Sequence, residues 1–599
     1  MRIDENEKVD IWQIGNTGLR NPLRMQEGFL VFSQSQYVGN LRGKDNEIGF
    51  MKLLNEKNII HNEDGKDESG SYARKWRLMF ARYGFIYGKP EKIDGFRQDE
   101  LGALDDITPY GELFLKLDNV ASIQECYLRS LSVEQFWLAD KSGHFSPLRW
   151  VLAIMLELER RTGSSEFKAL EFALWGQTTD PRYDLSEVVD HILDFRTRKE
   201  LAPSKKRFDK DEIAKRASHY VKKSDNFKEY YDMNIRNLRA SGLLLRKGRG
   251  IIINPSKHIM VEELAKTTAS NEPMIDVFRS LTTGAKLPTD DLVVANRVLS
   301  DMEQQLKARH IHYDISDLSL DTASEANIAR IRLEEILAQT DEINYAADQK
   351  NKWQEISDYM SLLIKGGGKK EYDDDYVIEV PKDETPAYLE WTLWRAALAI
   401  NHLANMPYEV RGFRLDSDFL PVTAAGGGKG DLYCEYDKYM ILTEVTMSTS
   451  SRQEAMEGEP VRRHVSDAVL KYNKPVYGMF IAVKIDTNTA ETFRHGIWYA
   501  KGDVQQRLII LPISLEQFQI FFENLFKTNQ AKPEKLVELI KSCVDKRDEM
   551  EAPAWKSYIE GTVRRLGAYV QHLTPYMSND QFNGYTSSTD SNNNDGNNE

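Results

Sequence analysis

The sequence predicts a multidomain protein with a mainly α-helical N-terminal half, a helical connector and a C-terminal α/β domain with a mixed sheet. Its 599 residues exceed the roughly 100 to 200 residues that one domain usually holds. The hydrophobic fraction of 41% and the mean hydropathy of -0.53 are typical of a globular chain. Clusters of turn-forming residues separate long helical patterns from one stretch of short apolar strands. We therefore expect several compact domains.

Two similar patterns occur in the first half of the chain. In the first, residues 72–83 have the apolar spacing of a helix that ends at Gly84, and a polar loop and the apolar segment 107–115 follow. In the second, a helix ending at Gly242 precedes apolar strands on either side of the basic turn 247–250. A helix, a glycine, an apolar strand, a turn and a second strand are typical of a winged helix.

A winged helix places the basic face of its helix in the DNA major groove and its wing on the backbone, but such modules also bind proteins. The formal net charge of the chain is -14, yet residues 201–250 carry 14 Lys or Arg against 6 Asp or Glu. This basic zone is either a surface for a polyanion or a solvated charged loop. The candidate DNA contacts on the two helices are Arg74, Lys75, Arg77, Arg82, Arg236 and Arg239.

Boundaries follow from clusters of glycine, proline and charged residues near 282–288 and 366–375. The last 24 residues are rich in Asn, Ser and Asp, and they lack the apolar groups that would offset the entropy of folding. We expect winged-helix subdomains at 1–130 and 131–285, a helical connector at 286–370, an α/β domain at 371–575 and a disordered tail at 576–599.

The most informative chemical signal is a pair of expected strands, 431–436 and 439–446, separated by Asp437–Lys438. If these two residues form a tight hairpin turn, Asp431 lies directly across from Glu444. Like charges that face each other about 5 Å apart destabilise a sheet unless a cation lies between them. A hard divalent cation held by oxygen ligands would supply that charge. A longer turn is the alternative, and it would shift the register and separate the two carboxylates.

A third carboxylate, Glu457, comes 13 residues after Glu444, immediately before an expected helix that starts at Pro460. That helix carries Arg462 and Arg463. Phosphodiester cleavage needs a polarised phosphoryl oxygen, an activated water and charge neutralisation. Three carboxylates and two guanidiniums around a metal ion would provide them.

Other constellations are weaker. The glycine run 426–430 does not match a phosphate-binding loop, because Thr423 and Gly430 stand where Gly and Ser or Thr are needed. His310 and His312 lack an evident third ligand for a metal ion. The tryptophans of 390–394 are expected in the core rather than in a base-stacking platform.

The catalytic block also carries a family resemblance. Gly430–Asp431, separated by twelve residues from Glu444-Val-Thr446, resembles the core of the PD-(D/E)xK nucleases. With 420–426 before it and 456–464 after it, the block is similar to the AlwI-type (BstNBI-like) family of type IIS restriction and nicking endonucleases. The likeness extends to 389–394, to 147–196 and to the second winged helix, so it covers most of the chain.

By this resemblance, Asp431, Glu444 and Glu457 would be the catalytic acids and the ligands of Mg²⁺, and Glu390 an auxiliary catalytic acid. The C-terminal domain would have the PD-(D/E)xK fold. Thr446 stands where the wider superfamily has its lysine, a departure that the family shares. The side chain that positions the attacking water is therefore open.

The expected function is sequence-specific hydrolysis of double-stranded DNA at a short distance outside an asymmetric site. One acidic cluster attacks one phosphate at a time, so a monomer should nick one strand. Cleavage of both strands would need a transient homodimer or a separate small nuclease subunit. The alternatives are a winged-helix DNA-binding regulator with an inert nuclease-like domain and a repair nuclease that recognises DNA structure.

We expect a cytoplasmic protein with no membrane contact. The first residues are polar and acidic, unlike a secretory signal. The longest purely apolar runs, such as Val151–Leu156, are far shorter than the roughly 20 residues that span a bilayer. The three cysteines lack the spacing of a zinc site and are expected to be reduced.

Overall fold

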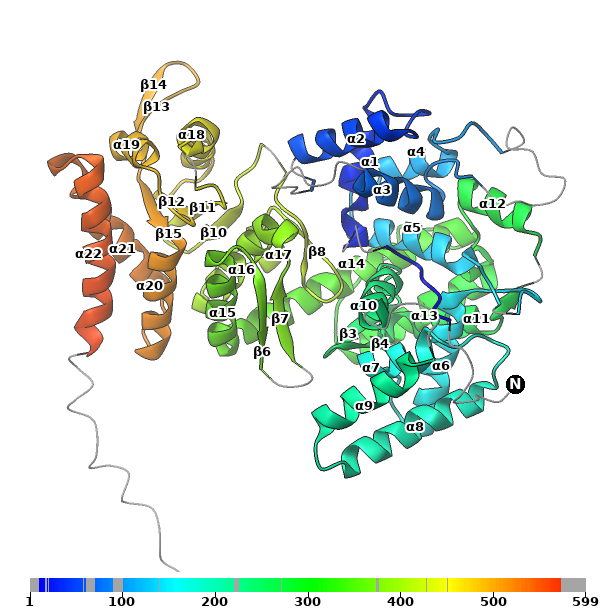
Figure 1. Cartoon of the computed structure of the whole chain (residues 1–599). Coiled ribbons are helices and arrows are strands. Elements are labelled where there is room, and N and C mark those ends of the chain that lie inside the picture. Colours follow the sequence, from blue (N-terminus) through cyan, green and yellow to red (C-terminus); the bar gives the residue numbers. More distant parts are fainter. Residues whose placement is uncertain are drawn as a thin grey trace, which may run out of the picture. The chain divides into compact units, whose positions relative to one another are not determined.

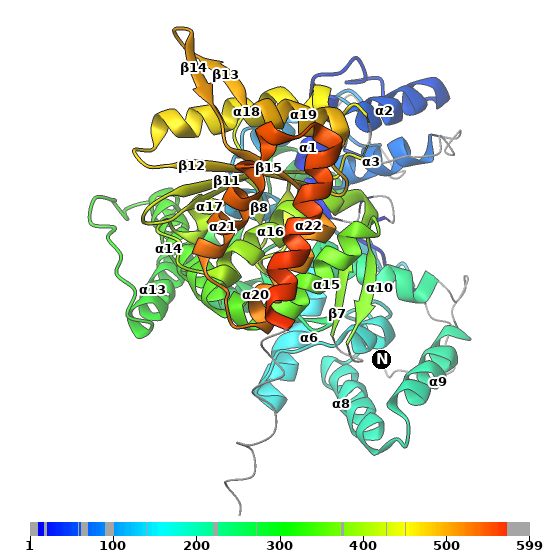
Figure 2. The same ribbon diagram turned by 90° about the vertical axis from the view of Figure 1, so that its left-hand side faces the viewer.

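The computed structural model of the chain describes residues 10–571 except 17–18, 20, 58, 61–69, 90–100, 139, 220–225, 271, 373–375, 427 and 450. The predicted disordered tail, 576–599, lies outside the described residues. The chain forms two compact units (Figures 1 and 2). The first unit comprises residues 1–345, 367–391 and 413–425, and the second comprises 346–366, 392–412 and 426–599. The predicted finer boundaries, near residues 130, 285 and 370, stay a prediction.

The first unit is mainly helical, as the sequence predicts (Figure 1). Its longer helices are α1 (Met25–Ser33), α2 (Lys44–Glu56), α3 (Ser71–Arg82), α4 (Pro109–Leu115), α5 (Val120–Val133), α6 (Pro147–Thr162), α8 (Leu185–Leu201), α9 (Lys205–Ala217), α10 (Asn226–Arg239), α11 (His258–Ala265), α12 (Met274–Thr283), α13 (Leu292–Ala308) and α14 (Ala323–Asp348), whose last residues enter the second unit.

Short strands complete the first unit. Strands β1 (Phe136–Trp137), β2 (His144–Phe145) and β5 (Ala269–Ser270) form one sheet, and three hairpins pair β3 (Leu244–Lys247) with β4 (Gly250–Ile253), β6 (Gly368–Glu371) with β7 (Val377–Val380) and β8 (Arg414–Leu415) with β9 (Pro421–Thr423).

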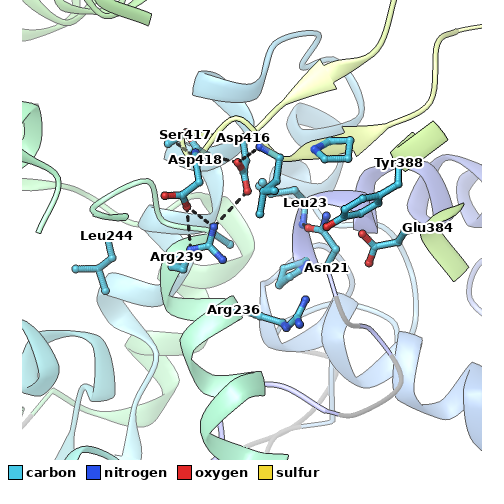
Figure 3. A pocket seen from close by; sticks show the side chains of 15 residues that line it. Asn21, Leu23, Arg236, Arg239, Leu244, Glu384, Tyr388, Asp416, Ser417 and Asp418 are labelled. Carbon is cyan, nitrogen blue, oxygen red and sulfur yellow. Dashed lines mark hydrogen bonds and ion pairs between the residues drawn. The ribbon is translucent and has the colours of Figure 1, made fainter. Parts of the chain in front are cut away.

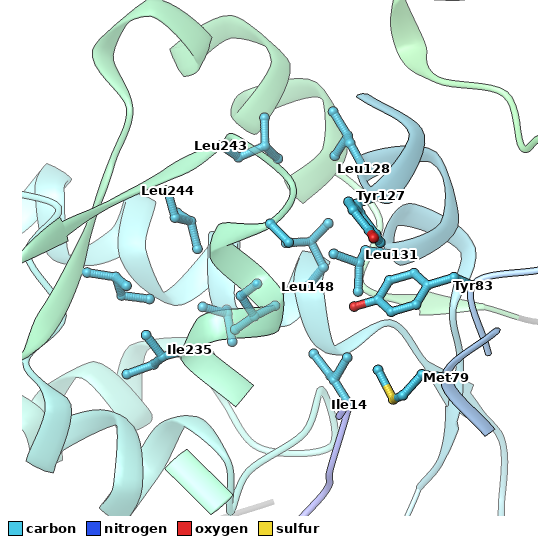
Figure 4. Packing of buried hydrophobic residues seen from close by; sticks show 14 of the residues in the cluster. Ile14, Met79, Tyr83, Tyr127, Leu128, Leu131, Leu148, Ile235, Leu243 and Leu244 are labelled. Atoms are coloured by element: carbon cyan, nitrogen blue, oxygen red, sulfur yellow. The ribbon is translucent and has the colours of Figure 1, made fainter. Parts of the chain in front are cut away.

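A single apolar cluster joins α3, α5, α6 and α10 at the centre of this unit (Figure 4). Tyr83 and Tyr127 meet edge to face with ring centroids 4.8 Å apart. The Tyr83 hydroxyl donates a hydrogen bond to Oδ1 of Asn237 at 2.6 Å, which satisfies a polar group inside the cluster. Burying each large side chain here contributes about 1.5–3 kcal/mol, and this packing fixes α10 against the N-terminal helices.

The first predicted winged helix is only partly reproduced. Residues 72–83 form α3 as predicted, and Gly84 has the positive φ of a helix C-terminus. The apolar segment 107–115, which a winged helix would make a strand, instead contains α4. Thr108 caps this helix by accepting a hydrogen bond from the Gly111 N–H at 2.9 Å, and Pro109 occupies its first turn.

The second predicted pattern has its expected elements. Helix α10 precedes Gly242, which has a φ of 72°, and β3 and β4 pair as an antiparallel hairpin. The basic turn lies between these two strands. The assignment of either pattern as a winged helix that binds DNA stays a prediction.

The second unit contains a four-stranded mixed sheet with the order β10 (Leu432–Glu435), β11 (Met440–Thr446), β12 (Val476–Ala482) and β15 (Ile510–Ser514). Strand β10 is antiparallel to β11, while β11, β12 and β15 run parallel. The predicted mixed sheet is therefore confirmed.

Helices pack on both faces of this sheet (Figure 2). Those that contact its strands are α17 (Pro407–Val410), α18 (Gln453–Lys471), α19 (Thr487–His495), α20 (Leu515–Lys527) and α21 (Pro533–Val544). Helices α15 (Trp353–Ile364) and α22 (Ala552–Gln571) both pack on α20, and β13 (Ile497–Ala500) and β14 (Val504–Arg507) form a separate hairpin. Side chains of α18 and α19 share a core with Met440, Leu442 and Phe480, so even-numbered residues of β11 face these helices.

Helix α16 (Thr385–Ile400) contributes to both units, with Trp391 grouped in the first and Thr392 in the second. Trp391 and Trp394 are both buried, as the sequence predicts for core residues. In the described part of the chain, no helix combines the length and the apolar character needed to span a bilayer.

Candidate active site

The hairpin of β10 and β11 has the predicted register. The Tyr436 N–H donates to the Tyr439 carbonyl at 2.9 Å, which closes a two-residue turn at Asp437–Lys438. Leu432 pairs with Thr443, so the next position outward places Asp431 across from Glu444. The alternative register, shifted by one residue, is therefore wrong.

Glu444 points into the side of the sheet covered by α18 and is 7% exposed. Its Oε1 lies 2.8 Å from Nδ1 of His464, a buried residue of α18. Nε2 of His464 has no hydrogen-bond partner among the described residues. The imidazole therefore fixes one oxygen of Glu444 and leaves its own second nitrogen available to a ligand.

Asp431 is held by the strand opposite. Its Oδ2 accepts a hydrogen bond from the Val445 N–H at 2.8 Å. The preceding residue is glycine for a steric reason, because a Cβ on Gly430 would lie 2.8 Å from Oε1 of Glu444 and 2.7 Å from Cδ1 of Leu442. Gly430 thus allows the backbone that carries Asp431 to approach Glu444 closely.

Glu457 lies on α18 rather than before it. The helix begins at Gln453, and Pro460 is inside it, so the predicted start at Pro460 is wrong. Proline is most common in the first turn of a helix, where its missing N–H costs nothing, so Pro460 predicts a helix start. Here it lies inside the helix, and the carbonyl of Met456 lacks the hydrogen bond that residue 460 would otherwise donate. A hydrogen bond from Thr446, the residue at the position of the missing lysine, lowers the pKa of Glu457, although burial raises that pKa more.

The three acids affect one another. Burial, and then the charge of Glu444, raise the pKa of Asp431 well above its ordinary value. Burial and the charge of Glu457 raise the pKa of Glu444 in the same way. Carboxylates that share a site without a neutralising cation behave like this, and a divalent cation bound by oxygen would relieve the repulsion.

The donor set therefore suits Mg²⁺ chemically. However, no group of three or more His, Cys, Asp or Glu in the described part of the chain is arranged closely enough to hold a metal ion. The metal-binding roles of Asp431, Glu444 and Glu457 stay a prediction.

The two predicted arginines of α18 have different surroundings. Nε of Arg462 donates to the Gly458 carbonyl at 2.8 Å, and its guanidinium lies 5.4 Å from the ring centroid of Trp498 in β13. Arg463 pairs with Glu459 at 3.1 Å, and its charge lowers the pKa of Glu444. Arg463 is therefore the one that acts electrostatically on the acids.

Glu390, the predicted auxiliary acid, is buried in α16 and grouped with the first unit. Its Oε2 accepts a hydrogen bond from the Ala425 N–H at 2.7 Å, at the end of the segment that leads toward Asp431. This contact gives Glu390 a structural role, and its auxiliary catalytic role stays a prediction.

The predicted DNA contacts of α3 are largely engaged within the first unit. Arg74 and Arg77 both pair with the buried Glu47, at 2.9 and 2.8 Å. Arg82 pairs with Glu134 at 3.0 Å. The ammonium group of Lys75 lies 5.4 Å from the ring centroid of Tyr72. Arg74 is the exposed member of this set.

The predicted DNA contacts of α10 are engaged more deeply (Figure 3). Arg236 pairs with Asp232 at 2.9 Å and with Glu379 at 3.5 Å. Arg239 pairs with Asp416 at 3.4 Å and with Asp418, both from the loop between β8 and β9. Their roles as DNA contacts stay a prediction, since DNA would have to compete with these acids.

Sequence reasoning missed the contact between His464 and Glu444. A signal for it was present, because His464 follows Glu457 by seven residues, and residues with that separation lie on one helix face. The acidic partners of Arg239 had no comparable signal, since they lie about 180 residues further along the chain.

A family model agrees with the resemblance. The family model described as AlwI restriction endonuclease matches residues 82–521. No curated protein matches the chain. Among solved structures, the chain is similar to the small subunit (R.BspD6I2) of the heterodimeric restriction endonuclease R.BspD6I, with 21% identity, a TM-score of 0.27 and coverage of 35% of this chain and 98% of that chain.

Two further solved structures are similar to the chain. One is the BpuJ1 endonuclease binding domain in complex with pyrene- and phenanthrene-modified DNA, with 11% identity, a TM-score of 0.31 and coverage of 47% of this chain and 97% of that chain. The other is the restriction endonuclease FokI, with 12% identity, a TM-score of 0.22 and coverage of 88% and 98%. Overlaps this weak do not show a shared fold.

Proposed function

The chain belongs to the AlwI restriction endonuclease family, and we propose that it is a sequence-specific type IIS DNA endonuclease. The proposed reaction is Mg²⁺-dependent hydrolysis of one phosphodiester bond a short distance outside an asymmetric recognition site. The observation that carries the proposal is the hairpin register, which sets Asp431 across from Glu444 with Glu457 close enough to raise the pKa of both.

Each residue of the cluster has a proposed task. Asp431, Glu444 and Glu457 would hold Mg²⁺, and when bound this ion supplies charge neutralisation at the phosphate and an acidified water. His464 keeps Glu444 in one orientation through the 2.8 Å contact at Nδ1. Thr446 would favour the charged form of Glu457 through its hydrogen bond, although burial raises the pKa of Glu457 more.

Recognition and cleavage are proposed to use different parts of the chain. The acidic cluster belongs to the second unit, whereas the basic helices α3, α9 and α10 belong to the first. A DNA duplex that is read by one unit and cut by another is cut outside its recognition sequence. This separation is the physical basis of the proposed type IIS behaviour.

A monomer is proposed to nick. Within the described residues we assign one such cluster, and one cluster attacks one phosphate at a time. An asymmetric site offers no two-fold axis that would recruit a second copy by symmetric binding. The second cut would then require transient pairing of two nuclease domains or a separate small nuclease subunit.

Supercoiled plasmid incubated with Mg²⁺ tests the proposal. We expect open-circle DNA to accumulate before linear DNA at low enzyme concentration, and linear DNA, where it forms, to rise more steeply than in proportion to enzyme. EDTA should abolish both products. Sequencing of the cut ends should give one offset from one asymmetric sequence.

Three outcomes would contradict the proposal. Specific DNA binding without cleavage in Mg²⁺ would indicate a regulator with an inert nuclease-like domain. Cuts without any sequence preference would indicate a structure-specific repair nuclease. Linear DNA formed at once, in proportion to enzyme, would show that one chain cuts both strands.

A further inference from the structure

Helices α8 and α9 follow each other as a helical hairpin (Figure 1), and the charged residues of α9 differ between its inner and outer sides. On the inner side, Phe208 of α9 stacks near Phe195 of α8 with ring centroids 5.3 Å apart. Two acids of α9 also turn inward. Asp209 pairs with Lys199 at 2.8 Å, and Glu212 pairs with Arg198 at 2.7 Å. The contact between the two helices therefore pairs two acidic residues of α9 with cations of α8.

The outer side of α9 is left with an excess of positive charge. Its exposed basic residues, here called the α9 cationic face, are Lys205, Lys206, Arg207, Lys210 and Lys215. Asp211 is the one exposed acid of this helix, and it lies 3.8 Å from Arg207. Lys205 pairs with Glu200 at the end of α8.

Lys206 and Lys210 are the most available cations of this face. They lie one helical turn apart, about 6 Å along the axis, so they point to the same side. Within the described part of the chain, neither has an acidic partner within the 4.0 Å that defines an ion pair. This distinguishes them from Arg77, Arg82, Arg236 and Arg239, whose charges are matched by acids of the first unit.

Helix stability does not account for this arrangement. The first turn of α9 contains three cations and no acid, although negative side chains are favoured there. The chain as a whole has a formal net charge of -14, so an unmatched cationic face is not a consequence of its composition. A polyanion would neutralise this face and release counterions.

We propose that the α9 cationic face binds the sugar-phosphate backbone of duplex DNA, with Lys206 and Lys210 as its main contacts. The inference rests on the proposed function, and it adds a surface that supplies affinity without reading sequence. Point charges on flexible stems suit phosphates in any sequence context, whereas base readout needs a fixed bidentate geometry.

The test compares Lys206→Gln/Lys210→Gln with the unaltered full chain in EDTA, where no strand is cut. Binding is measured against salt concentration on a duplex that contains the mapped recognition sequence and on a scrambled duplex. We expect the slope of log affinity against log salt to become shallower by about 1.8 on both duplexes. Affinity at ~0.15 M salt should fall on the order of tenfold for each.

Two matched variants serve as controls. Lys206→Arg/Lys210→Arg retains the charges and should keep the slope of the unaltered chain. Lys532→Gln/Lys541→Gln removes two exposed lysines of the second unit and should leave the slope unchanged.

An unchanged slope and affinity in Lys206→Gln/Lys210→Gln would overturn the inference, and so would a loss confined to the specific duplex. Plasmid cleavage by the unaltered chain, measured in parallel, separates this failure from a failure of the proposed function. If the unaltered chain cuts plasmid and Lys206→Gln/Lys210→Gln binds DNA as the unaltered chain does, the proposed role of the α9 cationic face is refuted and the proposed function is not.

Discussion

Two buried clusters of charge, one in each unit, are balanced differently among the described residues. In the first unit, Arg239 pairs with both Asp416 and Asp418, so one guanidinium offsets one of the two carboxylate charges. In the second unit, the described residues place no Lys or Arg within ion-pair distance of Asp431, Glu444 or Glu457. The first cluster therefore contains a cation in direct contact with its acids, whereas the acids of the second have no Lys or Arg in direct contact among the described residues.

This difference helps to separate structural charge from functional charge. Burying a charge costs free energy unless a partner offsets it, so a cluster that persists without a partner is a candidate for a ligand site. Both clusters contain residues that the sequence predicted to be functional. Arg239, a predicted DNA contact, has acidic partners inside the first unit. The predicted metal ligands have no Lys or Arg partner among the described residues.

The largest expected effect comes from neutralising an acid of the second-unit cluster, which consists of Asp431, Glu444 and Glu457. Glu444→Gln or Asp431→Asn should remove cleavage, a loss of several kcal/mol of transition-state stabilisation and about 10³-fold or more in rate. Thermal stability should stay unchanged or rise, because a buried charge without a partner is removed. Plasmid nicking and thermal unfolding measure the two effects.

Asp467→Asn, an exposed acid on the same helix α18, is the matched control and should cut normally. Cleavage by Glu444→Gln at the wild-type rate would mean that the cluster around Glu444 is not the catalytic site.

The next largest effect concerns the first-unit cluster of Arg239, Asp416 and Asp418. Arg239→Met should leave two buried carboxylates without their cation and lower the free energy of unfolding by about 3–5 kcal/mol. Arg207→Met changes an arginine whose side chain is 85% exposed, so it should have little effect. Urea unfolding of both variants gives the difference.

Equal stability of Arg239→Met and Arg207→Met would show that Arg239 does not stabilise the fold by offsetting Asp416 and Asp418. A loss of DNA affinity with no loss of stability would instead favour the role of Arg239 as a DNA contact.

The smallest effect depends on pH. Burial, and then the charge of Asp418, raise the pKa of Asp416 to about 6, because one guanidinium serves two carboxylates. A raised pKa in the folded state means that the stabilising contribution is fully present below the ordinary Asp value, near 4, and is lost as pH rises through about 6. The loss is at most about 3 kcal/mol.

Asp416→Asn should lack this step. Its Oδ1 can still accept the hydrogen bonds that Asp416 receives from the N–H groups of Asp418 and Leu420, both at 2.9 Å. Urea unfolding of wild type and variant between pH 4 and pH 7 should therefore give curves that diverge. Parallel curves would show that Arg239 balances both acids completely.

Local chemistry explains which parts of the fold were predictable. The register of β10 and β11 depends on the two-residue turn at Asp437–Lys438, a local signal between neighbouring strands, and the prediction is confirmed. The sequence also contains the signal for α4, since Thr108 followed by Pro109 is typical of a helix start, whereas the apolar pattern after it predicts a strand and that prediction is wrong. The start of α18 was misplaced because an interior proline resembles a first-turn proline.

Long-range pairing explains what was not predictable. The basic residues of α3 and α10 have the composition of a DNA-binding face, and only the fold shows that Glu47, Glu134, Asp416 and Asp418 meet them. The same holds for α9, whose exposed lysines become distinctive once Asp209 and Glu212 are seen to turn inward. The candidate acids were recognisable from spacing and resemblance, whereas their electrostatic environment required the structure.

The path of the chain has a consequence for synthesis and for gene fusion. The chain passes between the two units after residues 345, 366, 391, 412 and 425, so five crossings interleave them. The first unit cannot finish folding on the ribosome until residue 425 has emerged, because Asp416, Asp418 and Val422 belong to its buried contacts. By then part of the second unit has also been made. A single cut after residue 345 would keep the second unit whole but would carry residues 367–391 and 413–425 of the first unit with it, so one cut of the gene cannot transfer the second unit free of the first.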